Sequence, residues 1–554
     1  MNLKWISILF LNFWLSTQIS YGISLPKKWV DQLIDINKGS TTSYISRSGD
    51  LKMTDGTLLS YTSFTPRRAS AEKKPGVILI SPWGWPGEVY LLSDIPQTLA
   101  EAGFVVMMYT ARGFWDSQGL VDLAGAKDLA DLKKVVDWMT DNLPIDSTKL
   151  GTSGISFGAG LALISLAKEP RIKTAVALSS WAHLFEGGLF YGGAFHNRAL
   201  QELLATEGGP GDRKRGIDSI KQRVDDYVQG IRKAETDEWA NLRSPTRQLE
   251  EMNRRLDASS YILHTYGDQL FNPNSLLELH QGLRIPKKVE FIAGTHGVSQ
   301  LLDPILQSGV KDRVVRWFQE RLMTQVPVSD EVLVEVRSPL RQRSKAKKKD
   351  RQMESFAEFP PQNSQTHRWY LRTQDGRSKL LRTPPQSVEI KTLYAGEGAV
   401  IFEGQDLKSE FILEALTGRL VTEKLKTLNK PGVLWFESAP FGEVMKIRGV
   451  PKLTVHVDSE EDSSLLVAYL FDLDPQGVLN YVSTGTKAVR SSGEPVLVNL
   501  KLQLSAYDIQ VGHRLVLAFE SQKRGVSPQT TEGQEINLIQ SPSAPSVLSI
   551  EMIP

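Results

Sequence analysis

The stretch that decides the fold is KLGTSGISFGAGLALI, residues 149–164. It begins as an apolar, strand-like run, passes through Gly154-Ile155-Ser156-Phe157-Gly158, and ends in small apolar residues typical of a helix. Gly-x-Ser-x-Gly between a strand and a helix is the sequence of a nucleophile elbow, in which the glycines permit a strained turn and close helix–strand packing. We therefore expect Ser156 to expose its hydroxyl at the top of a sheet. The alternative is a glycine-rich turn with an idle serine.

Strand-like and helix-like segments alternate from about residue 76 to residue 322, as in a mostly parallel α/β sheet. Residues 41–66 before them look like a short β region, in which residues 53–59 resemble the antiparallel hairpin that commonly opens such domains. We therefore predict an α/β-hydrolase domain over residues 41–328. Its expected strands lie at 77–80, 104–108, 149–153, 174–178, 261–263 and 289–292, with helices around 129–139 and 312–322.

A serine nucleophile needs a base to accept its proton and an acid to orient that base. In α/β-hydrolases the acid and the base follow the serine along the chain, each at the end of a late strand. Asp268 follows the strand-like run 261–263, and His296 follows 289–292 in a glycine-flanked loop. The sequence predicts Ser156 as nucleophile, His296 as base and Asp268 as orienting acid. Asp116 is the competing acid, although it precedes Ser156.

An oxyanion hole requires two hydrogen-bond donors. We expect one from the backbone N–H of Phe157, the residue after the nucleophile. The second should come from the loop after an early strand, where the backbone or indole N–H of Trp83 is the candidate. Alternatively, Trp83 and Trp85 only form a wall of the substrate pocket.

Residues 182–258 interrupt the alternation with helical, charged and glycine-punctuated sequence. An insertion at this point of the chain would lie over the site as a cap. Trp181, Phe185 and Glu186 at its start are candidate substrate-binding residues. Ordinary packing between cap and body is the alternative interpretation of the aromatic pair.

The hydrophobic period changes to two in the last third of the chain, for example over residues 496–504. This pattern predicts an antiparallel β-sandwich of the jelly-roll, galactose-binding-like kind over residues 369–554. A connecting segment, 329–368, contains the basic run RQRSKAKKKDR at 341–351. The run is either a solvated loop or a contact for an anionic surface or polymer. It has no interleaved aromatic residues, so a specific nucleic-acid site is not expected.

The composition limits the partners and the kinds of catalytic or metal site that the protein can have. The 554 residues include 65 basic and 63 acidic side chains, and this balance favours neither nucleic acid nor an anionic membrane as partner. The absence of cysteine excludes disulfides, cysteine nucleophiles and zinc–thiolate sites. We expect no metal and no cofactor.

The N-terminus has the pattern of a secretory signal. Lys4 supplies a positive charge, residues 5–15 are apolar, and small residues at 20 and 22 predict cleavage after Gly22. The predicted signal peptide is therefore residues 1–22, and the protein is expected in the periplasm or secreted. An uncleaved N-terminal anchor is the alternative. We expect no other membrane span.

Several motifs resemble those of the X-Pro dipeptidyl-peptidase and cocaine-esterase-type acyl hydrolases. These enzymes join an α/β-hydrolase domain with a helical cap to a C-terminal jelly roll. The family often has tyrosine at the positions of Trp83 and Phe157. The matching segments are Arg112-Gly113-Phe114-Trp115-Asp116-Ser117-Gln118-Gly119, Asp137-Trp138, Gly449-Val450-Pro451, LFDLDPQG at 470–477 and VGHRL at 511–515.

The motifs and the resemblance predict an exported serine hydrolase that cleaves acyl esters or amides through an acyl-enzyme. An acyl esterase of cocaine-esterase type is the leading interpretation, with a small-molecule ester, an amide or a short peptide as substrate. The alternative is an X-Pro dipeptidyl-peptidase, which must hold a free ammonium; Glu186 is its candidate anchor. A non-catalytic carbohydrate-binding protein is the remote alternative. The sequence leaves the acyl group, the leaving group and the oligomeric state open.

Overall fold

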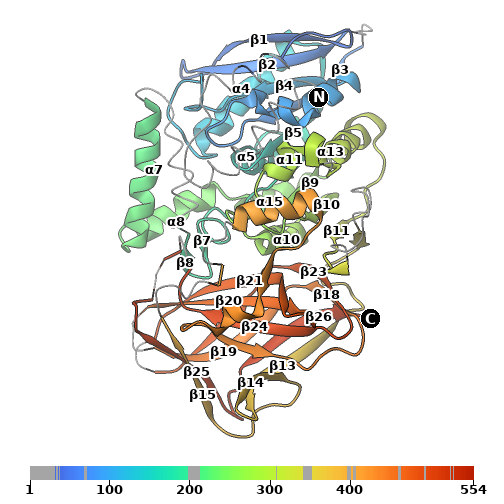
Figure 1. Cartoon of the computed structure of the whole chain (residues 1–554). Helices are drawn as coiled ribbons and strands as arrows, with labels where there is room; N and C mark the ends of the chain where they lie inside the picture. The colour runs from blue at the N-terminus through green and yellow to red at the C-terminus, as the bar shows by residue number, and fades with distance from the viewer. Residues whose placement is uncertain are drawn as a thin grey trace.

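The structure is a computed structural model of the chain (Figure 1). It describes residues 32, 35, 38–67, 72–196, 212–306, 308–340, 352–395, 401–402, 407–459, 463–491, 494–523, 526–527 and 530–554. The predicted signal peptide and the basic run at 341–351 lie outside the described residues.

The N-terminal domain is built on a ten-stranded sheet in the order β1-β2-β4-β3-β5-β6-β9-β10-β11-β12. Neighbouring strands from β4 across to β11 pair in parallel, whereas β1, β2 and β12 are joined by antiparallel pairing. The strands are β1 (Tyr44–Lys52), β2 (Leu58–Pro66), β3 (Lys74–Ile80), β4 (Val105–Tyr109), β5 (Ile145–Ile155), β6 (Ile172–Leu178), β9 (Ser259–Thr265), β10 (Lys287–Ile292), β11 (Glu331–Glu335) and β12 (Met353–Phe356).

Helices cover both faces of this sheet, because consecutive residues of its central strands are apolar and so both faces are apolar. In β3, Ile78 and Ile80 belong to one hydrophobic cluster, while Val77 and Leu79 belong to a second one on the opposite face. The α/β architecture predicted from the alternating pattern is confirmed. The helices of this body are η2 (Gly87–Ser93), α3 (Ile95–Glu101), α4 (Ala126–Asn142), α5 (Phe157–Lys168), α10 (Pro273–Gly282), α11 (Val298–Leu301), α12 (Asp303–Leu306), α13 (Val310–Gln319) and η4 (Glu320–Thr324).

The segment 329–368, predicted as a connection, contributes two strands to the body. β11 pairs with β10 in parallel, and β12 pairs with β11. Val332 and Val334 of β11 are buried, so the alternation of apolar residues over only five positions suffices to place this strand in the sheet, between β10 and the edge strand β12. The sheet of the N-terminal domain therefore extends beyond residue 328, to Phe356.

The cap insertion is mostly helical and is joined to the C-terminal domain. Its short hairpin pairs β7 with β8. The N–H groups of Phe195 and Ser527 each donate to the other residue's carbonyl, at 2.6 and 2.7 Å, and Ala488 N–H donates to the Gly192 carbonyl at 2.9 Å. The cap elements are β7 (Phe190–Tyr191), β8 (Ala194–Phe195), α7 (Asp212–Val228), α8 (Lys233–Leu242), η3 (Pro245–Gln248) and α9 (Leu249–Asn253).

The C-terminal domain is all-β apart from short helical segments, as predicted, and its strands form one large, almost entirely antiparallel sheet. Inward-facing residues at period two fill its core, for example Leu453, Val455 and Val457. Its elements are β13 (Gln365–Gln374), β14 (Arg377–Leu381), β15 (Glu389–Tyr394), α15 (Leu407–Thr417), β16 (Thr422–Lys424), η5 (Leu425–Asn429), β17 (Leu434–Glu437), β18 (Met445–Gly449), β19 (Lys452–Ser459), β20 (Ser464–Leu473), β21 (Val478–Val489), β22 (Val496–Lys501), β23 (Ser505–Ile509), β24 (Arg514–Glu520), β25 (Glu535–Gln540) and β26 (Val547–Ile553).

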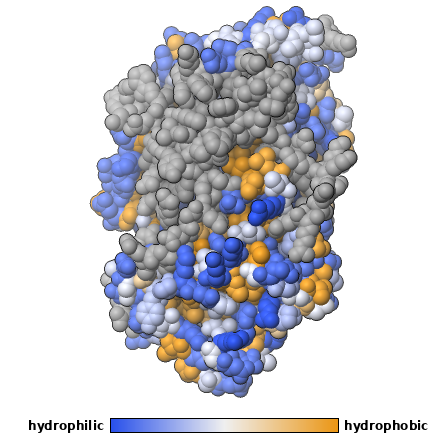
Figure 2. All heavy atoms as spheres, in the orientation of Figure 1, coloured by the Kyte–Doolittle hydropathy of each residue, from blue (hydrophilic) through white to orange (hydrophobic). Residues whose placement is uncertain are grey.

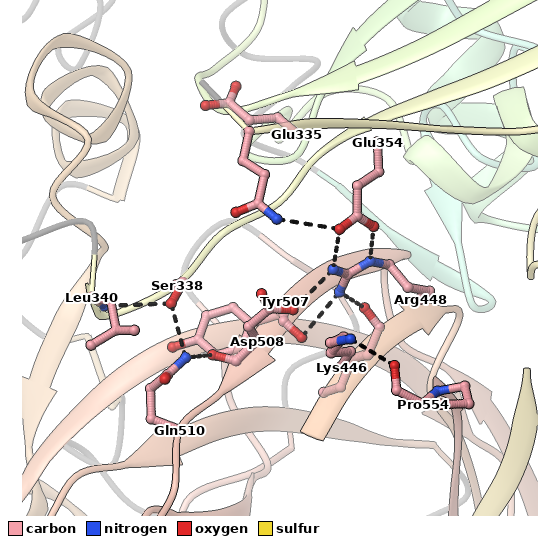
Figure 3. Close-up of polar contacts among 12 residues, drawn as sticks. Glu335, Ser338, Leu340, Glu354, Lys446, Arg448, Tyr507, Asp508, Gln510 and Pro554 are labelled. Atoms are coloured by element: carbon pink, nitrogen blue, oxygen red, sulfur yellow. Dashed lines mark hydrogen bonds and ion pairs between the residues drawn. The ribbon is translucent and has the colours of Figure 1, made fainter. Parts of the chain in front are cut away.

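A buried arginine on the C-terminal domain forms an ion pair with the N-terminal domain (Figure 3). The Arg448 side chain is fully buried on β18 and donates to both carboxylate oxygens of Glu354 on β12, at 2.6 and 2.9 Å. It also donates to Asp508 on β23 at 2.9 Å. In the part of the chain that the structure describes, no helix is both long and apolar enough to cross a membrane. On the face shown in Figure 2, hydrophilic and hydrophobic residues are mixed over the C-terminal domain.

Candidate active site

Ser156 occupies a strained position between β5 and α5. Its backbone has φ 58° and ψ −116°, a conformation that costs an L-residue free energy and is found mainly at functional sites. The Ser156 N–H donates to the Leu178 carbonyl of β6 at 2.9 Å, and only 7% of the residue is exposed. This is the backbone geometry expected of a nucleophile elbow.

The two glycines of the motif are sterically required. A Cβ atom at Gly158 would lie 2.2 Å from the Ile80 carbonyl oxygen of β3. A Cβ atom at Gly154 would lie 2.2 Å from the backbone of Gly158. Because real Cβ contacts are not shorter than about 3.0 Å, any side chain here would push α5 away from the sheet.

Tyr90 holds the backbone next to Ser156 through two hydrogen bonds. This residue was not predicted from the sequence. Its buried hydroxyl accepts a hydrogen bond from Ile155 N–H at 2.7 Å and donates one to the Ile80 carbonyl at 2.7 Å. Burial raises the pKa of Tyr90 well above its ordinary value, so the phenol stays protonated. No motif in the sequence marks this residue, because its role depends on two strands that are distant along the chain.

Asp268 and His296 form a direct pair at the ends of β9 and β10. Nδ1 of His296 lies 2.7 Å from Oδ2 of Asp268. Oδ1 of Asp268 accepts hydrogen bonds from the N–H groups of Leu270, at 2.9 Å, and Phe271, at 3.0 Å. Burial alone would raise the pKa of Asp268, but His296, His264 and these hydrogen bonds hold it below its ordinary value. The ionised carboxylate can only accept, so Nδ1 of His296 carries the proton and Nε2 is left as the acceptor.

The loop of His296 lies against the residue that precedes Ser156. A Cβ atom at Gly297 would lie 3.2 Å from Cγ2 of Ile155. The Gly297 N–H and the side chain of Gln300 both donate to Oγ of Ser179, at 3.3 and 3.0 Å, which fixes this loop over β6. Nε2 of His296 is buried and has no hydrogen-bond partner among the described residues, so the Ser156–His296 hydrogen bond is not formed here. Such bonds are often long in free enzymes and shorten in the complex with substrate.

A second imidazole, that of His264, lies beside the same carboxylate. Its Nε2 is 3.6 Å from Oδ2 of Asp268 and donates to the Phe271 carbonyl at 3.1 Å. Burial lowers the pKa of His264, so the ring is neutral at pH 7. No sequence motif marks His264, because it lies inside the strand β9 rather than in a loop after it. Asp116, the competing acid, is exposed.

Trp83 and Phe157 are brought together at the start of α5. Their ring centroids are 6.2 Å apart, and each also packs edge-on against Phe114, at 5.1 and 5.6 Å. Both side chains are buried. This packing supports the interpretation that the indole of Trp83 forms a wall of the substrate pocket. The backbone N–H groups of Phe157 and Trp83 remain the candidate oxyanion donors. Trp85 is half-buried in the same loop.

The candidate residues at the start of the cap have different surroundings. Trp181 lies against Gly160 of α5 and against Phe271, whose ring packs edge-on against His296 at 5.2 Å. Phe185 is buried among cap aromatics, and Glu186 is exposed. The structure thus links Trp181 to the base through one ring, whereas the ring partners of Phe185 belong to the cap core: Phe190, Tyr227 and Trp239.

Two family models match the chain. The model described as X-Pro dipeptidyl-peptidase (S15 family) matches residues 55–298, and the model described as X-Pro dipeptidyl-peptidase C-terminal non-catalytic domain matches residues 335–547. The chain belongs to the S15 family of serine hydrolases. Membership of this family removes the non-catalytic carbohydrate-binding alternative. Among the described residues, no cluster of three or more histidine and carboxylate side chains could hold a metal ion in this S15-family protein.

Solved structures share the fold of this S15-family chain over nearly its whole length. An aminopeptidase from the marine sediment archaeon Thaumarchaeota archaeon superposes with a TM-score of 0.69 at 13% identity, over 92% of this chain and 97% of that one. An α-amino acid ester hydrolase gives 0.69 at 16% identity, over 93% and 97%. A CocE/NonD family hydrolase from Staphylococcus aureus gives 0.66 at 16% identity, over 92% and 94%.

Two curated relatives match a smaller part of the chain. Each is described as an uncharacterized 31.7 kDa protein in the traX-finO intergenic region of Escherichia coli and is 26% identical over 126 residues. Each match covers 23% of this chain and 43% of the relative, so the chain spans less than half the length of those proteins.

Proposed function

We propose that this protein is an exported acyl esterase that works through an acyl-enzyme on Ser156. The observation that carries the proposal is the hydrogen-bonded Asp268–His296 pair, together with the contact between the His296 loop and Ile155, the residue before a serine held at φ 58°. S15-family membership already establishes a serine hydrolase. What we propose beyond this is the identity of the catalytic residues, the class of substrate and the export of the protein.

The reaction begins when Oγ of Ser156 attacks the acyl carbon and His296 Nε2 takes its proton. Asp268 stays ionised and stabilises the imidazolium that forms, because its pKa is held low. The backbone N–H groups of Phe157 and Trp83 donate to the tetrahedral oxyanion. His296 then passes its proton to the leaving alkoxide, and a water molecule, activated by the same imidazole, hydrolyses the acyl-enzyme.

The environment of Glu186 supports an ester rather than a dipeptide as substrate. An X-Pro dipeptidyl-peptidase must bind a free ammonium, which needs a desolvated carboxylate or carbonyl group. Glu186, the candidate anchor in the cap, is exposed to solvent. The matching family is that of X-Pro dipeptidyl-peptidases, which supports the peptidase as the second candidate.

Purified wild type and Ser156→Ala should be compared on p-nitrophenyl butyrate and on Gly-Pro-p-nitroanilide. We expect rapid ester cleavage by wild type, no anilide release, and a loss of about a million-fold in turnover in the variant. Anilide release that depends on Ser156 would establish the dipeptidyl-peptidase instead. Equal activities of wild type and variant would exclude Ser156 as the nucleophile.

Export is a separate part of the proposal and rests on residues 1–22 of the sequence. N-terminal sequencing of protein recovered from the periplasm or medium should begin at Ile23. Recovery of the intact N-terminus in the membrane fraction would instead indicate an uncleaved anchor.

A further inference from the structure

The loops that carry Asp268 and His296 lie against a helix of the C-terminal domain. This helix, α15, belongs to the region matched by the model described as non-catalytic. Figure 1 shows it in orange at the junction of the two domains, and it contacts α11, which begins two residues after His296.

One face of α15 contacts both loops. A Cβ atom at Gly267, the residue before Asp268, would lie 2.3 Å from Cγ of Phe411, so the phenyl ring rests directly on the backbone of the acid loop. A Cβ atom at Gly294, two residues before His296, would lie 3.5 Å from Cβ of Ala415. The two loops are themselves joined, since Gly267 N–H donates to the Gly294 carbonyl at 2.9 Å.

A buried ion pair holds α15 in this position. Arg337 Nε donates to Glu414 Oε1 at 2.7 Å, and both side chains are only 3% exposed. The same guanidinium donates to the carbonyls of Tyr481, at 3.2 Å, and Val482, at 3.1 Å, on β21. Phe411 packs edge-on against Tyr481 at 5.5 Å. These contacts hold α15 against β21 of its own domain, independently of its contact with the Asp268 loop.

Glu335, the last residue of β11 (Figure 3), supports the same loops from another side. Its Oε2 accepts from Ala293 N–H at 3.0 Å, and its carbonyl accepts from the Tyr266 hydroxyl at 3.1 Å. Ala293 and Tyr266 lie in the loops of His296 and Asp268, respectively. Two independent supports from residues beyond 330 thus converge on the acid and the base.

We propose that α15 is a positioning element, in which Phe411, anchored through Glu414 and Arg337, sets the position of Asp268 relative to His296. The proposal rests on the catalytic roles proposed above for that pair. Removal of the ring leaves a cavity beside Gly267, into which the acid loop can relax. A displacement of about 1 Å between reacting groups can lower the rate about 100-fold, so a small relaxation is sufficient.

The test compares Phe411→Ala with Leu413→Ala, a control on the exposed side of the same helix. Hydrolysis of p-nitrophenyl butyrate is measured across pH, and active sites are titrated with a fluorophosphonate. For Phe411→Ala we expect kcat per titrated site to fall about 10- to 100-fold with KM nearly unchanged. The acidic limb of kcat/KM should move to lower pH, because a displaced Asp268 carboxylate stabilises the protonated imidazole less. Leu413→Ala should behave as wild type.

A purely structural role gives a different result. Phe411→Ala would then lower the fraction of titratable sites, while kcat per site and the acidic limb stay at wild-type values, and this outcome overturns the proposal. If Phe411→Ala does not fold, Phe411→Leu and Glu414→Gln keep most of the buried volume and should show smaller changes in the same direction. Activity in Ser156→Ala would instead refute the proposed function itself, so the two failures are distinguishable.

Discussion

The close approach of α5 to β3 makes Gly158→Ala a sharp test of the elbow. The added Cβ would lie 2.2 Å from the Ile80 carbonyl oxygen, 2.9 Å from its carbon and 3.0 Å from the Ser81 carbonyl oxygen. All three atoms belong to the backbone of β3 and of the residue after it. Backbone atoms, unlike a side chain, cannot rotate out of the way. The helix must therefore retreat by about 0.8 Å to reach the 3.0 Å that real Cβ contacts respect.

This retreat should affect stability and turnover separately. Overpacking of a close-packed interior costs about 1–3 kcal/mol in the free energy of unfolding. Ser156 precedes the first residue of α5, so a shift approaching 1 Å should lower kcat by about 100-fold. Denaturant unfolding and p-nitrophenyl butyrate kinetics, with fluorophosphonate titration of active sites, measure the two effects.

Gly442→Ala is the matched control, because Gly442 is exposed and a Cβ atom there meets no atom within 4 Å. It should leave both stability and turnover unchanged. Wild-type kcat and stability in Gly158→Ala would refute the reasoning that this contact fixes the nucleophile. A loss of stability with unchanged kcat per titrated site would show that the helix can move without displacing Ser156.

Three further substitutions follow from buried hydrogen bonds. Asp268→Asn should lower kcat by about 10,000-fold, because an amide there selects the wrong tautomer of the histidine; unchanged circular dichroism would exclude misfolding. Tyr90→Phe leaves the Ile155 N–H and the Ile80 carbonyl unpaired and should cost about 1–3 kcal/mol per group in denaturant unfolding; a neutral effect would mean that water replaces the hydroxyl. Burial raises the pKa of Glu520 from 4.5 to about 7. Between these two pH values the folded state keeps a proton on Glu520 that the unfolded state has lost. The free energy of unfolding should therefore fall by at most about 3 kcal/mol as the pH rises through that interval. In Glu520→Gln this pH dependence should disappear from the unfolding curves, and its persistence would assign it to another group.

Much of the fold was predictable because its signals are local. The sequences that became β3, β4, β6 and β10 are short and mostly apolar, as is typical of buried strands, and their separation by helical segments implies a parallel sheet. The strand β11 was not predicted, because five residues with two buried valines do not distinguish a strand from a linker. Its place depends on pairing with β10, about forty residues earlier in the chain.

The sequence by itself determined the candidate nucleophile and the order of the candidate acid and base. Gly154 to Gly158 carry a local strand–turn–helix motif, and Asp268 and His296 each follow a strand within a few residues. Only the tertiary structure decided which groups hold these residues in place. Tyr90 and Phe411 act across strands and domains far apart in sequence, where van der Waals contact and hydrogen bonding leave no periodic signal.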